Sequence, residues 1–472
     1  MKILLLNPPD EKGGLFIREG RCTQQEGIWA ALWPPISLVN IGTLLKEKKQ
    51  DVKIIDCPAE RISLKKLKQV IKSYQPDVVV WSTGTPTIES DLNLAKLIKD
   101  VKPSVKTAVF GTHVTVLDKE CMERNPYLDV AVRNEPEYTI KEWIDAIINK
   151  KGCENVMGLT YRDKDGKITR NPPGKYISNL DELPFPDWSL VNTNSYRLPL
   201  KGDCYLMIAP LRGCPFPCTF CTCQTYYGNK LRLRSVSSII CEIRYDIQEF
   251  GVNNFFFWAE TFTINQKFVK ELCKEIILND LDIKWTCNSR IDTVDREMLA
   301  LMSESGCWMI SYGIESINSK ILEAVKKNFS YEQISEAVRL TKHNGIMAAG
   351  HIIFGLPGET VESAKMTIKK VKELDLDFAQ FYCAVPFPGS ELYNTALNKG
   401  WIKGQGFESF RQEKAVMSLP TITTDQVVKI RKQAIKEFYG RFIVIKNIIR
   451  LIKPRAFGSI ASSFFKFVKG LV

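Results

Sequence analysis

The feature that most constrains the fold is a regular alternation of short apolar runs with amphipathic stretches, repeated over two long blocks of the chain. Apolar runs of roughly four to eight residues favour strands, and apolar residues spaced three or four apart favour helices. Strands that alternate with helices favour a parallel sheet covered by helices, because parallel strands need crossover connections. The predicted fold class is therefore α/β, with one sheet in each block.

The first block, residues 1–150, predicts a Rossmann-like, doubly wound parallel sheet. Its predicted strands are 2–6, 52–56, 78–82, 107–110 and 130–132, and its predicted helices are 37–48, 64–73, 88–100 and 137–149. Small, polar, turn-forming residues follow the strands, and sheets of this kind bind ligands beyond the carboxyl ends of their strands. We therefore expect a ligand crevice there. No G-x-G-x-x-G run is present, so a nicotinamide dinucleotide is not the expected ligand.

Residues 151–200 have a different character, with a predicted hairpin about Asp165-Gly166 followed by a proline-rich extended linker. The second block, residues 201–395, predicts six β/α units that form a partial TIM-type barrel. Its predicted strands are 205–208, 254–258, 283–287, 309–312, 347–353 and 378–385, and its helices are 237–250, 266–278, 295–305, 330–344 and 360–373. The chemistry of such a barrel belongs at the carboxyl ends of its strands.

Three cysteines, Cys214, Cys218 and Cys221, follow the first strand of this second block at the spacing C-x3-C-x2-C. Soft thiolate ligands select iron–sulfur clusters, and a four-iron cluster normally takes four of them. Three ligands leave one iron open, and an open iron can bind a substrate or a cofactor. The motif therefore favours a catalytic cluster over a store of electrons.

Two other interpretations of the cysteines stay open. A zinc site would call for paired cysteines and a fourth Cys or His ligand. Buried cysteines with no ligand role are disfavoured, because Pro215 and Pro217 stiffen the loop between them. Cys223 lies two residues beyond the motif, so the sequence does not exclude a fourth cluster ligand, although we expect three.

The cysteine spacing, with the aromatic Phe220 before the last cysteine, resembles the signature of the radical S-adenosylmethionine (radical SAM) superfamily. The resemblance implies that the cysteines hold a [4Fe-4S] cluster, that the methionyl group of S-adenosylmethionine takes the open iron, and that one electron cleaves the sulfonium to a 5′-deoxyadenosyl radical. It further implies cofactor-binding roles near the strand ends, for Phe220, Glu260, Ser289, Arg290, Glu315 and Gly355. Catalytic residues are not assigned.

These implied roles agree with the chemistry of the side chains. A guanidinium fork such as that of Arg290 suits a carboxylate. A carboxylate such as that of Glu315 accepts hydrogen bonds from ribose hydroxyls or from the methionyl amine. Glu260 departs from the family pattern, because the run Trp258-Ala259-Glu260-Thr261 stands where Asp-Asp is usual.

The first block resembles the cobalamin-binding domain of the cobalamin-dependent radical SAM class. The resemblance rests on Pro34-Pro35 before a helix, on Asp56 at the end of a strand, on Gly111-x-His113 and on Arg133-x-Glu135-x-Glu137, with Asn134 where the family usually has Gly. It implies cobalamin as a third cofactor, bound by Thr83, Gly111, His113 and Glu135. The D-x-H-x-x-G box is absent, so we expect no histidine ligand below the cobalt. A scaffold without a ligand is the alternative, and His113 alone fits loop packing better than metal ligation.

Residues 396–472 form a predicted basic helical tail. No acid follows Glu437, while lysines and arginines alternate with Phe, Ile, Leu and Val. This pattern favours a helix on an anionic membrane surface, and a helix docked on the barrel is the alternative. The net charge of +12 is concentrated in this tail, and no nucleic-acid-binding fold is visible, so nucleic acid is not an expected partner.

Fourteen cysteines without a signal peptide favour a reducing, cytoplasmic location, and no run of 18 apolar residues predicts a spanning helix. Together with the tail, these features predict a cytoplasmic protein that is peripheral at the inner face of the membrane. The resemblance to cobalamin-dependent radical SAM enzymes implies methyl transfer to, or radical rearrangement of, an unactivated carbon, and the basic apolar tail favours a hydrophobic small molecule or lipid as the substrate. An electron donor such as flavodoxin or ferredoxin is the expected partner. The alternatives are an oxidative cyclase on a tetrapyrrole-like substrate and a non-enzymatic iron–sulfur protein.

Overall fold

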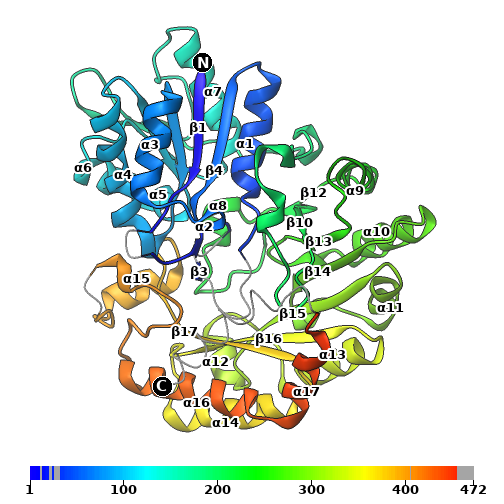
Figure 1. Ribbon diagram of the computed structural model, residues 1–472. Helices are drawn as coiled ribbons and strands as arrows, with labels where there is room; N and C mark the ends of the chain where they lie inside the picture. Colours follow the sequence, from blue (N-terminus) through cyan, green and yellow to red (C-terminus); the bar gives the residue numbers. More distant parts are fainter. Residues whose placement is uncertain (11–12, 21–23, 26–31, 404–405, 454–472) are drawn as a thin grey trace.

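The computed structural model describes residues 1–10, 13–20, 24–25, 32–403 and 406–453. Two large sheets organise these residues, one in each half of the chain. Figure 1 shows the N-terminal half above, the second half to the right and below, and the C-terminal helices beneath. The predicted mixed α/β class is confirmed.

The N-terminal sheet has the strand order β4-β1-β5-β6-β7-β8-β9. Its strands are β1 (Lys2–Asn7), β4 (Asp51–Asp56), β5 (Val78–Ser82), β6 (Lys106–Phe110), β7 (Val130–Val132), β8 (Leu159–Arg162) and β9 (Ile168–Arg170). The order around β1 reverses, as in doubly wound sheets, so the carboxyl ends of β1 and β5 flank the point at which such sheets bind ligands. The interior strands are buried on both faces, because helices cover both sides.

The helical elements of this half are α1 (Ile36–Glu47), α2 (Cys57–Glu60), α3 (Leu64–Tyr74), η1 (Thr85–Thr87), α4 (Ile88–Val101), α5 (Thr112–Val116), α6 (Asp118–Arg124) and α7 (Pro136–Ile148). A short ribbon of β2 (Phe16–Ile17) and β3 (Gln24–Gln25) precedes α1. The predicted hairpin about Asp165-Gly166 forms β8 and β9, and β8 pairs antiparallel with β7. The hairpin that the sequence placed in the linker therefore extends the N-terminal sheet.

The linker contributes η2 (Leu180–Glu182), η3 (Trp188–Leu190) and η4 (Thr193–Ser195). The second sheet then holds β10 (Leu206–Ile208), β13 (Asn254–Phe257), β14 (Lys284–Ser289), β15 (Cys307–Glu315), β16 (Met347–Phe354) and β17 (Phe378–Cys383). All six are parallel and lie in sequential order. Sequential parallel order is what a partial barrel requires, and the barrel itself stays a prediction.

The other elements of the second half are β11 (Leu211–Arg212), α8 (Cys223–Tyr227), β12 (Arg232–Leu233), α9 (Val236–Phe250), η5 (Phe262–Ile264), α10 (Gln266–Leu278), η6 (Ile291–Thr293), α11 (Arg296–Glu304), α12 (Ser319–Ala324), α13 (Tyr331–His343) and α14 (Val361–Glu373). The chain ends in α15 (Glu391–Asn398), η7 (Phe407–Ser409), α16 (Thr424–Tyr439) and α17 (Phe442–Leu451). Helices α13, α14 and α16 each begin at a capping box, at Ser330, Thr360 and Thr423.

Helix α16 covers the outer edge of β17. The hydroxyl of Tyr439 donates to the carbonyl of Ala379 (2.7 Å) and accepts from its N–H (3.3 Å). Arg431 donates to the carbonyl of Phe381 at 2.7 Å. These side chains occupy main-chain groups that an edge strand otherwise leaves exposed.

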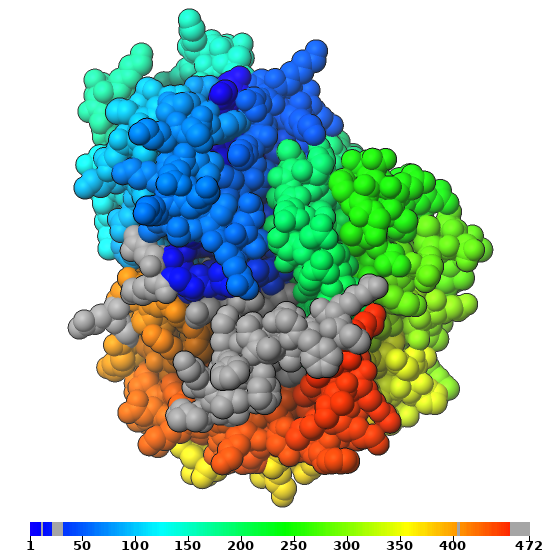
Figure 2. Space-filling model, viewed as in Figure 1, coloured from blue at the N-terminus to red at the C-terminus, as the bar shows by residue number. Residues whose placement is uncertain are grey.

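The two halves lie against each other, and Figure 2 shows the blue-to-cyan N-terminal half in contact with the green second half. Strand β1 runs from the N-terminus toward the second half, so its carboxyl end faces that half (Figure 1). No helix among the described residues is long and apolar enough to cross a membrane.

Candidate functional site

A cavity of about 270 Å³ lies on the inner face of the second sheet. Its wall comes from the cysteine loop after β11, from the ends of β13 to β17, and from Glu19, Gly20 and Trp33 of the N-terminal half. Side chains of a parallel sheet meet at the carboxyl ends of its strands, which is where the sequence placed the chemistry.

The cysteine loop brings Cys214, Cys218 and Cys221 to the wall of this cavity. The loop starts at Gly213, whose φ is +85° and where a Cβ atom would stand 2.2 Å from the carbonyl oxygen of Lys230. Only glycine fits such a close approach, so this residue sets the direction in which the loop leaves β11. The loop is tied down further along, because Thr219 accepts from the N–H of Leu392 at 2.7 Å.

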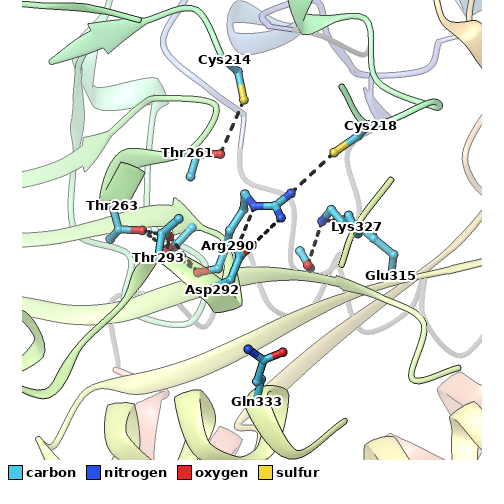
Figure 3. Close-up of polar contacts among 12 residues, drawn as sticks. Cys214, Cys218, Thr261, Thr263, Arg290, Asp292, Thr293, Glu315, Lys327 and Gln333 are labelled. Atoms are coloured by element: carbon cyan, nitrogen blue, oxygen red, sulfur yellow. Dashed lines mark hydrogen bonds and ion pairs between the residues drawn. The ribbon is translucent and has the colours of Figure 1, made fainter. Parts of the chain in front are cut away.

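The Arg290 guanidinium lies beside Cys218. One of its N–H groups points at the Cys218 sulfur at 3.7 Å, and two others grip Asp292 at 2.8 and 2.7 Å. Its plane lies over the Phe216 ring, 3.8 Å from the ring centre. Although burial works against the charge, hydrogen bonding to Asp292 holds the pKa of Arg290 above its usual value. Figure 3 shows this arrangement, with Cys214 directed at Thr261 nearby.

A second cation, Lys327, lies across the cavity from this arginine. Its ammonium group contacts Glu315 at 2.7 Å and the Gly313 carbonyl at 2.9 Å, and both side chains of the ion pair are buried. Glu315 has a φ of +60°, which is rare for a residue other than glycine and typical of positions held for function. Burial raises the pKa of the Cys218 thiol, and Lys327 and Arg290 oppose that rise.

The other residues that we predicted near the cluster divide into two groups. Phe220, Glu260 and Ser289 line the same cavity as the cysteines, and Ser289 joins a buried hydroxyl cluster with Thr263 and Thr293. Gly355 does not line the cavity. Its N–H donates to Glu359, and burial raises the pKa of that acid to about 8.

The predicted cobalamin residues of the N-terminal half lie beyond the carboxyl ends of β5, β6 and β7. A Cβ atom at Gly111, where φ is +140°, would stand 2.1 Å from the Thr83 carbonyl oxygen, so the two loops meet as bare backbone. The Thr83 hydroxyl donates to the buried Asp91 at 2.8 Å. The Nδ1 atom of His113 lies 3.2 Å from the Thr85 hydroxyl, and burial lowers the pKa of this histidine to about 3. His113 is therefore neutral, and its ring packs edge-on against Phe407, 4.6 Å between ring centres.

Glu135 faces the second half of the chain. Its two carboxylate oxygens accept from Arg232 at 2.8 Å each, and Arg212 lies 3.5 Å away. Glu137 accepts from Arg212 at 2.6 Å. These four residues (Glu135, Glu137, Arg212 and Arg232), of which all but Arg232 are buried, are called the inter-half network here, and they join α7 to the β11–β12 ribbon beside the cysteine loop. Asn134 has a φ of +63°, which explains why an asparagine can stand where the family usually has glycine.

Sequence reasoning missed several residues of the cavity, namely Glu19, Trp33, Lys327, His351, Gln380 and Tyr382, and it missed Asp292, the partner of Arg290. Lys327 follows α12 and not a strand, so it could not be predicted from the rule that functional residues lie at the carboxyl ends of strands. His351, Gln380 and Tyr382 lie within strands, where only period-two alternation marks the inward positions.

Thiolates, hydrogen-bond donors and cations near the cysteines fit an iron–sulfur cluster. The sulfur of Cys218 faces Arg290, and the sulfur of Cys221 accepts from the N–H of Cys223 at 3.4 Å; hydrogen bonds to the sulfurs are one means by which proteins tune such clusters. Within the described ranges, no three Cys, His, Asp or Glu side chains converge on one point as a single metal ion requires.

The bare backbone at Gly111 and Thr83, at the ligand-binding edge of a doubly wound sheet, fits a large planar cofactor.

Comparison with known proteins gives two family matches. Residues 208–371 match the radical SAM superfamily, and residues 30–144 match the B12 binding domain. An uncharacterised methyltransferase from Pyrococcus horikoshii is 33% identical over 449 residues, which are 95% of each chain. The anaerobic magnesium-protoporphyrin IX monomethyl ester cyclase of Rubrivivax gelatinosus is 28% identical and covers 95% of this chain and 79% of its own.

One solved structure has the same fold over nearly the whole chain. It is the radical S-adenosylmethionine methyltransferase TsrM from Kitasatospora setae, with tryptophan and a SAM analogue bound. The TM-score is 0.70 at 16% identity, and the match covers 96% of this chain and 89% of that chain.

Proposed function

Because the chain belongs to the cobalamin-dependent radical S-adenosylmethionine enzymes, we propose that it transfers a methyl group to an unactivated carbon of a hydrophobic metabolite or lipid. Its cofactors are a [4Fe-4S] cluster, S-adenosylmethionine and cobalamin. The observation that carries the proposal is the meeting of three cysteines with Arg290 and Glu315 in one cavity. Membership of this family removes the non-enzymatic iron–sulfur alternative.

We assign the cofactors to parts of the chain as the sequence predicted. Residues 1–150 bind cobalamin, residues 151–200 connect, residues 201–395 form the radical SAM partial barrel, and residues 396–472 form the C-terminal helical region. The two family matches, over 30–144 and 208–371, support this division. Because β8 pairs with β7, we include the hairpin of β8 and β9 in the first of these units.

The chain's own residues hold the cofactors and exclude water. Cys214, Cys218 and Cys221 supply thiolates to the cluster, and Glu315 accepts from hydroxyl or amine groups of the adenosyl ligand. When bound, cluster and S-adenosylmethionine supply hydrogen abstraction and cobalamin supplies methyl transfer. Arg290 is committed to Asp292 and Cys218 in this structure, so we assign it a role beside the cluster as well as the predicted contact with the methionyl carboxylate.

Anaerobic reconstitution tests the proposal directly. We expect about four irons and one cobalamin per chain, together with reductant-dependent cleavage of S-adenosylmethionine. Cys218→Ala should abolish the cleavage, and Cys241→Ala, at an exposed cysteine far from the motif in sequence, should not. Cleavage retained in Cys218→Ala, or a protein that takes up no iron, would contradict the assignment of the cluster.

The lipid part of the proposal rests on α17. Val444, Ile448 and Leu451 of this helix pack onto the second sheet, whereas Phe442, Ile445 and Ile449 are exposed beside Lys446 and Arg450. An exposed face that combines aromatic and aliphatic side chains with cations suits an anionic membrane surface. The remaining tail residues, 454–472, lie outside the described residues.

Flotation with anionic liposomes tests this surface. Removal of residues 441–472, and separately the double substitution Phe442→Ser with Ile449→Ser, should each reduce the bound fraction severalfold. The double variant guards against a general loss of folding, because both side chains are exposed. Equal flotation of all forms would remove the reason for proposing a lipid substrate or a peripheral location.

A second candidate function is oxidative cyclisation of a tetrapyrrole-like substrate. The favouring observation is the relative from Rubrivivax gelatinosus, which matches 95% of this chain and carries the name of such a cyclase. S-Adenosylmethionine labelled with ¹³C in its methyl group separates the two functions. Label found on protein-bound cobalamin supports methyl transfer, and turnover without label transfer supports cyclisation. Flavodoxin or ferredoxin is the proposed electron donor in both cases.

A further inference from the structure

The cavity also extends along the inner face of the second sheet. Its lining there includes uncharged polar side chains that belong to the strands themselves. Successive residues of a strand point to opposite faces, so every second position faces the cavity. The inward positions are Asn288 in β14, Ser311 in β15, His351 in β16, and Gln380 and Tyr382 in β17. We call His351, Gln380 and Tyr382 the polar floor.

The polar floor is held together by hydrogen bonds around one hydroxyl group. His351 and Gln380 are register partners on adjacent strands. The Tyr382 hydroxyl lies 3.3 Å from the Nδ1 atom of His351 and donates to the side-chain oxygen of Gln380. The His351 and Tyr382 rings stack with their centres 5.9 Å apart and their planes 12° from parallel. All three side chains are half-buried, so they are ordered and still reach the cavity.

The walls around the polar floor are mostly apolar. Trp33 of the N-terminal half, Phe256 of β13, Met309 of β15 and Leu198 of the linker line the same cavity. Apolar walls with a few placed hydrogen-bonding groups are the usual composition of a small-molecule site, where the polar groups fix the orientation of the ligand.

Among the described lining residues, the lysine and arginine are Lys327 and Arg290, and Lys327 lies beside the polar floor, because it contacts the carbonyl of Gly313, the register partner of His351. Arg290 is paired with Asp292, and Lys327 with Glu315. Glu19 also lines the cavity, and burial raises its pKa to about 8, so it is neutral at pH 7. An anionic group at the polar floor would meet no described lining lysine or arginine that lacks an acidic partner, and a buried charge without a partner of its own is costly.

Part of the polar floor also lies deeper in the cavity than the carboxyl ends of the strands. His351 and Gln380 each lie three residues before the last residue of their strands, which is about 10 Å along a strand at 3.3 Å per residue, whereas Tyr382 is next to the end of β17. A ligand that reaches the polar floor therefore extends past the level of the strand ends, where the adenosyl cofactor is proposed to lie.

We propose that the polar floor binds an uncharged hydrogen-bonding group of the substrate, a ketone, amide or hydroxyl carried on a hydrophobic body. His351, Gln380 and Tyr382 are then specificity-determining residues. This inference rests on the proposed function, because that function makes the cavity a substrate site. It narrows the substrate class to molecules whose buried end is polar and neutral.

A matched pair of probes tests the inference on the full chain with its cofactors reconstituted. The probes are 2-acetylnaphthalene, a neutral aromatic ketone, and 2-naphthoate, its anionic counterpart, and binding is measured by anaerobic calorimetry with S-adenosylmethionine present. We expect the ketone to bind at least tenfold more tightly than the carboxylate. Tyr382→Phe should weaken the ketone by about two- to tenfold, the usual net range for one hydrogen bond.

Tyr331→Phe is the matched control, because the Tyr331 hydroxyl faces Lys370 and Glu373 on the outside of the molecule. It should leave the affinity for the ketone unchanged. Three results would overturn the inference. They are equal or tighter binding of the carboxylate, no binding of either probe, and an unchanged ketone affinity in Tyr382→Phe. Iron and cobalamin content of the same samples distinguishes this failure from failure of the proposed function.

Discussion

Arg290 illustrates how one side chain serves two neighbours. Its contacts with Asp292 fix the guanidinium, and its remaining edge faces the sulfur of Cys218. Cations and hydrogen bonds near the cysteine sulfurs raise the reduction potential of an iron–sulfur cluster, because they stabilise the added electron. We therefore expect the same arginine to influence electron transfer, in addition to the cofactor binding that the sequence predicts.

The first prediction concerns this contact. Arg290→Gln should lower the reduction potential of the cluster by on the order of 60 mV, which is a tenfold change for a one-electron couple. The measurement is a redox titration followed by electron paramagnetic resonance, without S-adenosylmethionine, so that cofactor affinity does not enter. Arg296→Gln, at an exposed arginine in the next helix, is the control. An unchanged potential in Arg290→Gln would show that the contact has no influence on the cluster.

The second prediction concerns Gly111, where a Cβ atom would stand 2.1 Å from the Thr83 carbonyl. Gly111→Ala should separate the two loops, lower the melting temperature and reduce bound cobalamin severalfold. Gly345→Ala is the control, because it also places a methyl group at a glycine of positive φ (+73°), but no atom lies within 4 Å of that methyl group. If both variants retain equal amounts of cobalamin, the close approach of the loops does not shape the site.

At the scale of elements, the inter-half network determines how α7 meets the β11–β12 ribbon. Arg212 is buried between Glu135 and Glu137, and those carboxylates hold the pKa of Arg212 well above its usual value despite the opposing effect of burial. Removal of one partner from a buried ion pair leaves the other charge without compensation. The network is therefore a strong link between the two sheets.

The third prediction follows from that link. Arg212→Met should lower the free energy of unfolding by about 3–5 kcal/mol, because the buried carboxylate of Glu137 loses its partner, whereas Glu135 keeps Arg232. Urea unfolding of the protein measures the change. Arg339→Met, which removes a fully exposed pair with Glu336, should have no measurable effect. Similar losses in both variants would contradict a special role for the buried network.

Local pattern was sufficient for most strands and for the cysteine motif, because alternation and short spacings are properties of neighbouring residues. It was not sufficient for pairing at a distance. The hairpin of β8 and β9 was expected, but its attachment to β7 was not, because edge pairing leaves little trace in a short strand. The contacts of Lys327 with Glu315 and of Asp292 with Arg290 were not predicted for a related reason, because loops determine which side chains these residues meet.

At the scale of the whole molecule, several acids are buried with raised pKa values. Burial raises the pKa of Asp246 to about 9, with the nearby Glu242 adding to the rise, and it raises the pKa values of Glu19 and Glu359 to about 8. The folded chain binds these protons more tightly than the unfolded chain does. Stability from these groups is therefore complete below about pH 4 and is lost as the pH rises toward 9.

The fourth prediction tests this pH dependence. Asp246→Asn should reduce the fall in unfolding free energy between pH 5 and pH 9, by up to about 1.4 kcal/mol per pH unit, because one proton no longer has to be held. Chemical unfolding at several pH values gives the slope for each form. Asp145→Asn, at a carboxyl group on the outer side of α7, should leave the slope unchanged. A slope equal to that of the parent in Asp246→Asn would show that Asp246 ionises freely in the folded chain.

Tyr439 and Arg431 of α16 cover the edge of β17. This cover limits how the chain can be divided, both in evolution and in protein engineering. A chain cut after residue 395 would keep every cysteine and every strand, yet it would expose a bare strand edge to other copies of itself. We therefore expect the second half of the chain to need α16 when it is transferred to another protein. Recombination that separates the two would yield aggregates, so we expect them to be transmitted together.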